Sequence, residues 1–71
     1  MTSDIQAILF DRSIWTIANS KKWMNYHKFI SIKAPHLTKN KIRFRLEEPS
    51  EFKRLRIKRL GNGIELIIGF Y

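Results

Sequence analysis

The chain has 71 residues and no cysteine, and 44% of it is hydrophobic. This length supports a single domain, residues 1–71, with a thin core, and the apolar content excludes a disordered tail. Without cysteine there can be no disulfide and no thiolate ligand or nucleophile. The net charge of +8 predicts a negatively charged partner, because solubility alone seldom requires so large an excess of cations.

No segment approaches the roughly 20 apolar residues that span a bilayer. The apolar run Ala7–Phe10 is short and lies between Asp4 and Asp11, which is not the pattern of a secretory signal peptide. We therefore expect a soluble protein that neither spans a membrane nor is secreted, and the absence of cysteine fits an intracellular or intravirion setting.

The first third of the chain predicts a strand and then a helix. Ile5–Phe10 is a short apolar run bounded by polar residues, which indicates a strand. Thr16, or Ser13 one turn earlier, can cap a helix because its hydroxyl accepts a free backbone N–H. The spacing i, i+3, i+4 and i+7 then places four side chains on one helix face. They are Ser20, Trp23, Met24 and His27.

The middle of the chain predicts two further strands. Phe29–Lys33 is expected to be the second strand, and Ala34–Asn40, which contains Pro35, a loop. In Lys41–Glu47 apolar and charged residues alternate, which is the period of a half-buried strand. Glu48–Glu51 contains a proline and interrupts this alternation.

The last third predicts a β-hairpin. Leu55–Leu60 and Ile64–Phe70 flank Gly61-Asn62-Gly63, and Asn-Gly favours the left-handed dihedral angles of a type I′ turn. Leu60 breaks the alternation of apolar and basic residues in the first of these strands, which indicates a bulge near the turn.

These elements follow the order β-α-β-β-β-β. One helix with one apolar stripe can cover one face of a mainly antiparallel sheet of four to five strands. The predicted fold class is therefore a two-layer α+β domain. The pattern does not define the order of the strands in the sheet.

Six basic residues alternate with the apolar positions of two predicted strands. If those strands are neighbours, the six cations share the sheet face opposite the helix. Like charges that face one another destabilise a sheet, so this face indicates a bound anion, and the arginine fork suits phosphate. We expect non-specific binding of nucleic acid through its phosphates. The predicted contacts are Lys41, Arg43, Arg45, Arg54, Arg56 and Lys58.

Two alternatives use the same residues. They could meet an acidic protein surface, as in an interaction module or an inhibitor that mimics a basic partner, or they could only keep exposed strand edges soluble. Trp15 and Tyr26 could stack on bases, although such residues lie more often in the core or at its rim.

Nothing in the sequence indicates catalysis, a metal or a cofactor. His27 closes the apolar helix face, where a structural role is expected, and His36 has no second ligand at metal-binding spacing. Glu47, Glu48 and Glu51 lie in one short turn, whereas a metal-dependent nuclease needs carboxylates from separate elements. We expect a protein that is not an enzyme.

Short motifs are scattered over residues 14–69. They are Trp15-Thr16, Trp23-Met24, His27, Arg43-Phe44-Arg45, Pro49, Phe52, Leu60-Gly61, Gly63-Ile64 and Gly69. This set resembles a family of small uncharacterised proteins of tailed phages and large DNA viruses, in which a similar segment is sometimes fused to, or encoded beside, prohead-maturation proteases. The chain departs from the family pattern at Ile17, Met24 and Glu48. The resemblance implies a viral accessory protein, in the host cell or within the virion, with a place in head assembly or genome packaging.

Overall fold

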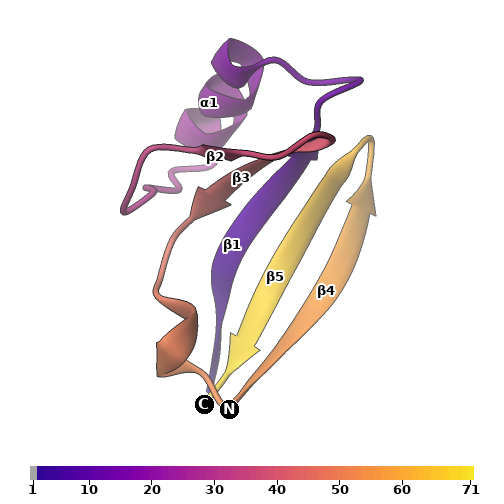
Figure 1. The fold of residues 1–71 in the computed structure, drawn as a ribbon. Helices are drawn as coiled ribbons and strands as arrows, with labels where there is room; N and C mark the ends of the chain where they lie inside the picture. Colours follow the sequence, from indigo (N-terminus) through magenta and orange to yellow (C-terminus); the bar gives the residue numbers. More distant parts are fainter. Residues whose placement is uncertain (1) are drawn as a thin grey trace.

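The computed structural model describes residues 2–71 and contains one helix packed on a five-stranded antiparallel sheet (Figure 1). The predicted α+β class is confirmed. In chain order the elements are β1 (Ser3–Asp11), α1 (Ile17–Tyr26), β2 (His36–Leu37), β3 (Lys41–Arg45), the short 3₁₀ helix η1 (Pro49–Glu51), β4 (Arg54–Gly61) and β5 (Ile64–Phe70). The strand order is β2-β3-β1-β5-β4, so β1 lies at the centre and β4 at an edge.

The core lies between α1 and the central strands of the sheet. Phe10 pairs with Ile42 of β3 on one side and with Ile64 of β5 on the other. Because directly paired residues of antiparallel strands project to the same side, all three face the helix. Met24 of α1 packs against them, and these side chains are at most 5% exposed. The apolar stripe of the helix and the alternation in three strands thus form one core.

The two ends of α1 are defined by local hydrogen bonds. The Thr16 hydroxyl accepts the backbone N–H of Asn19 at 3.1 Å, which confirms the predicted cap. At the other end Lys28 adopts a positive φ of 62°, and the Phe29 N–H donates to the Met24 carbonyl at 2.9 Å. This reversal directs the chain back toward the sheet.

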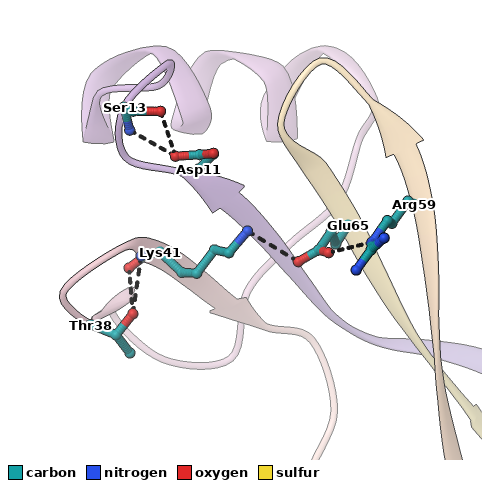
Figure 2. A network of polar contacts seen from close by, with 6 residues as sticks. All are labelled: Asp11, Ser13, Thr38, Lys41, Arg59 and Glu65. Atoms are coloured by element: carbon teal, nitrogen blue, oxygen red, sulfur yellow. Dashed lines mark hydrogen bonds and ion pairs between the residues drawn. The ribbon is translucent and has the colours of Figure 1, made fainter.

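The prediction of a strand at Phe29–Lys33 is wrong. The left-handed residue before it turns the chain across the end of β3, where the Ile32 N–H donates to the Arg45 carbonyl at 2.8 Å. The second strand is β2 instead, inside the predicted loop. It forms because the Thr38 hydroxyl accepts the Lys41 N–H at 3.0 Å and closes a tight turn into β3 (Figure 2).

β1 has a register shift near its start and a turn held by a side chain directly after its end. Its register with β5 shifts between Ile5 and Ala7, and the Gln6 carbonyl there accepts two N–H groups that follow β3, at 2.8 and 3.2 Å. This explains why β3 ends at Arg45, before the predicted Glu47. At its other end the Asp11 carboxylate accepts the Ser13 N–H and hydroxyl (2.9 and 2.8 Å), and these bonds lower the pKa of Asp11 (Figure 2).

The β4–β5 hairpin forms as predicted. Asn62 and Gly63 have φ values of 55° and 75°, as the two central residues of a type I′ turn require. The register shifts between Arg59 and Gly61, so Leu60 is the extra residue of a bulge. Within the described residues, no helix has the length and apolar content needed to cross a membrane.

Candidate functional site

The six basic residues expected on one sheet face lie on two opposite faces. β3 and β4 are separated by β1 and β5. Lys58 of β4 pairs with Leu66, which pairs with the core residue Ile8, so Lys58 projects to the side of the helix. Lys41 of β3 pairs with Asp11 and projects to the other side, which we call the open face. The structure therefore contradicts the shared six-cation face.

The bulge at Leu60 is the physical reason for this difference. A regular ladder from the turn would pair Ile57 with Ile68, which faces the helix. The extra residue moves the register by one, so Ile57 pairs with Ile67 and Arg56 pairs with Ile68. A one-residue shift moves every side chain of a strand to the opposite face. The basic residues of β4 consequently lie on the helix side and its apolar residues on the open face.

On the open face, Glu65 pairs with two cations, of which Lys41 is one of the six predicted contacts. Its carboxylate lies 3.2 Å from the Lys41 ammonium and 3.2 Å from the Arg59 guanidinium, so the network reaches from β3 to β4 (Figure 2). The hydrogen bond from Lys41 lowers the pKa of Glu65 below its usual value of 4.5, and the bond from Arg59 acts in the same direction. Lys41 is therefore already paired with a carboxylate within the fold.

The other two predicted contacts of β3 are also engaged. Arg45 lies 3.5 Å from the Glu48 carboxylate, and Arg43 donates to the Gln6 side chain at 3.5 Å. The Arg43 Nε atom is buried without a hydrogen-bond partner among residues 2–71. Half-buried cations with internal partners gain less from an external anion, because binding must first disrupt those contacts.

The three predicted contacts of β4 form a row that we call the cation ladder: Arg54, Arg56 and Lys58. All three are exposed, and no carboxylate of residues 2–71 lies within ion-pair distance of them. Alternate residues of a strand are about 7 Å apart, so the ladder presents evenly spaced charges along the edge of the sheet. The Arg54 guanidinium lies 5.7 Å from the centre of the Phe70 ring, beside which the half-buried Leu66 and Ile68 continue the helix-side face of β5.

A shallow pocket of about 560 Å³ lies between α1 and the turn of the β4–β5 hairpin. Trp15, Trp23 and Tyr26 line it together with Lys22 and Asn62. Sequence pattern did not predict this pocket, because the helical spacing placed Trp23 on the core face of the helix. The signal that marks it is the i, i+3, i+4, i+7 spacing of Asn19, Lys22, Trp23 and Tyr26.

The histidines and the acidic turn form no convergent site. His27 is exposed, and its ring lies 4.1 Å from that of Trp23, so it flanks the core instead of closing it. Burial raises the pKa of Glu47, and the carboxylates of Asp4 and Glu51 add to this effect. Among residues 2–71 no three histidine or acidic side chains come together as metal ligands would.

Comparison of the chain with models of known protein families, with curated proteins and with solved structures finds no match. The resemblance to proteins of phages and large DNA viruses stays a prediction. The function must be inferred from the cation ladder and its surroundings.

Proposed function

We propose that the protein binds nucleic acid non-specifically through the cation ladder on the helix side of β4. The observation that carries this proposal is that Arg54, Arg56 and Lys58 are exposed and form no ion pair with another of residues 2–71, whereas Lys41 and Arg45 do. A row of cations spaced by alternate strand residues suits a polymer with a regular repeat of phosphates better than a single small anion.

The chemistry of the ladder supports the same proposal. Two of its members are arginines, whose planar fork donates two hydrogen bonds to one phosphate. Lys53 precedes the ladder and is also exposed, which extends the positive charge toward the start of β4. A role beside a packaged viral genome, which the phage resemblance implies, would require such sequence-independent contacts.

The experiment is a fluorescence-anisotropy titration of the protein with labelled single-stranded DNA, duplex DNA and RNA at several salt concentrations. The triple variant Arg54→Ala/Arg56→Ala/Lys58→Ala should weaken binding at least tenfold and reduce the slope of log K against log salt by about 2. The matched control, Lys21→Ala/Lys28→Ala/Lys39→Ala, removes the same charge from other exposed positions.

Equal losses in the two triple variants would mean that net charge alone drives binding, and would contradict the ladder. Absence of binding by the unmodified protein at low salt would exclude the proposed function itself.

A second candidate, an acidic protein partner, is favoured by the free edge of β4. Leu55 and Ile57 are 44% and 65% exposed on the open face, and no strand of residues 2–71 pairs with the outer edge of β4. An extended segment that alternates acidic and apolar residues could pair there, with its carboxylates beside the ladder. A synthetic peptide of alternating Glu and Val should then bind, and its backbone N-methylated form should not.

A further inference from the structure

We call the pocket between α1 and the hairpin turn the aromatic pocket. Two of its three aromatic side chains pack on the core, and the third is exposed. The Trp15 indole N–H donates to the Asn62 carbonyl at 2.8 Å, and both indole rings contact Phe10 edge-on, with centroids 5.1 and 5.5 Å away. The positions of Trp15 and Trp23 are thus determined by packing on the core residue Phe10. Tyr26, by contrast, is 82% exposed, so most of its ring is open to a ligand.

The composition of the pocket matches a planar, polar-edged ring. Aromatic faces stack on nucleobases whatever their sequence, because every base has a π face. Asn19 and Asn62 lie in the wall and offer amide groups to the edge of such a ring. Lys22 lies at the same wall and can meet the phosphate attached to the base.

The pocket and the cation ladder lie on the same side of the sheet. The ladder projects to the helix side of β4, and the pocket is lined by residues of α1 and by Asn62 in the turn that follows β4. Lys58 precedes Asn62 by four residues, which span at most roughly 13 Å of chain. β4 runs toward the hairpin turn, which lies at the same end of the sheet as α1 (Figure 1). Because Asn62 of that turn lines the pocket, a phosphate chain that follows the ladder toward the turn is directed to the pocket.

We propose that this pocket takes an unpaired base of a single-stranded nucleic acid whose backbone is held by the cation ladder. The inference rests on the proposed function and narrows its ligand. In a duplex each base is stacked and paired, so it enters the pocket only at the cost of being flipped out. The protein should therefore prefer single strands to duplexes, which charge alone does not produce, since a duplex has the higher charge density.

The test compares a short oligothymidylate with a mixed-sequence duplex, using the full chain and the variant Tyr26→Ala. We expect the single strand to bind about tenfold more tightly than the duplex and to quench the fluorescence of Trp15 and Trp23. Tyr26→Ala should weaken single-strand binding about tenfold and leave duplex binding unchanged. The control is Ile30→Ala, which removes an equally exposed large side chain (84% against 82%) outside the pocket.

Four results would contradict the proposal that the pocket binds a base. If Tyr26→Ala leaves single-strand affinity unchanged, the proposed base-binding pocket is wrong and the cation ladder is unaffected. The same holds if the protein never binds the single strand more tightly than the duplex at any salt concentration. Binding of neither nucleic acid overturns the proposed function together with the inference. A loss for both ligands in Tyr26→Ala, equal to that in Ile30→Ala, also overturns the pocket, because it reflects general destabilisation.

Discussion

The side chain of Tyr71, which directly follows β5, contacts the central strand β1. Its phenol donates a hydrogen bond to the Asp4 carboxylate at 2.8 Å, and the ring packs on Phe52 with centroids 4.9 Å apart. The hydrogen bond to Asp4 raises the pKa of Tyr71 to about 12, since ionisation would break it and place two negative charges together. The bond stabilises the fold below the usual pKa of 10.0, and this contribution is lost as pH rises toward 12.

We expect Asp4→Asn to return the pKa of Tyr71 toward 10.0. Absorbance of the phenolate during an alkaline titration measures this, and Tyr26→Phe as the background leaves Tyr71 as the one tyrosine. A titration curve that is the same with Asp4 and with Asn would show that the contact is absent in solution.

β4 combines features that ordinarily oppose one another. It is a long edge strand with exposed apolar residues, which favours pairing with another chain, and it carries a row of cations, which opposes pairing with a chain of like charge. If two copies of β4 approached each other antiparallel, ladder would face ladder, and the like charges would repel. We therefore expect the residues that are proposed to bind phosphate also to oppose pairing of the protein with a second copy of itself.

The variant Arg54→Val/Arg56→Val/Lys58→Val should therefore self-associate. Sedimentation velocity over a range of concentrations would detect dimers and larger species, which we expect to be absent from the unmodified protein. Adding Ile57→Lys should restore the monomer, because it returns a charge to the exposed edge. Should the triple Val variant stay monomeric, the edge is protected by something other than charge.

At the scale of elements, patterns confined to neighbouring residues were predictable and pairings were not. The Thr16 cap and the Asn62–Gly63 turn follow from local chemistry, and both are confirmed. The bulge at Leu60 was also expected, but its effect on the faces of β4 depends on pairing with β5 and was missed. Phe29–Lys33 has the composition of a strand, yet the left-handed turn at Lys28 prevents it from pairing as one.

Across the whole sheet, Glu65 connects elements that are far apart in the sequence. Through Lys41 and Arg59 it links β3 to β4 over the open face. The lowered pKa of Glu65 means that the ionised carboxylate is favoured by the folded state. Its contribution to the free energy of unfolding is present above pH 4.5 and is lost as pH falls through the lower pKa of the folded protein.

Glu65→Gln should accordingly reduce the free energy of unfolding at neutral pH by on the order of 1 kcal/mol, because these ion pairs are partly exposed. The deficit should shrink as the protein is acidified below pH 4. Urea denaturation at both pH values measures it, with Glu51→Gln as a control, since Glu51 forms no ion pair among residues 2–71. An equal deficit at both pH values would contradict an electrostatic origin.

The strand order and the aromatic pocket belong to this larger scale, and neither was accessible from sequence pattern. Period-two alternation identifies which strand residues are apolar, but it does not say which strands are neighbours. The separation of Lys41 from Lys58 by two intervening strands is a result of that order. Likewise Trp15 and Asn62 are 47 positions apart and meet only because the hairpin turn lies beside the start of α1.

The central position of β1 in the sheet also affects the folding rate. β1 pairs with β5 from Ser3 against Phe70 to Phe10 against Ile64, so the middle of the sheet closes only when distant segments meet. Closing so long a loop costs conformational entropy before the contacts between its ends can stabilise the fold. Proteins rich in contacts between residues distant in the sequence fold in milliseconds to seconds. The β4–β5 hairpin, whose pairing is local, can form early, whereas the β1–β5 ladder must come late. Substitutions in that hairpin should then alter the folding rate, and substitutions along β1 mainly the unfolding rate.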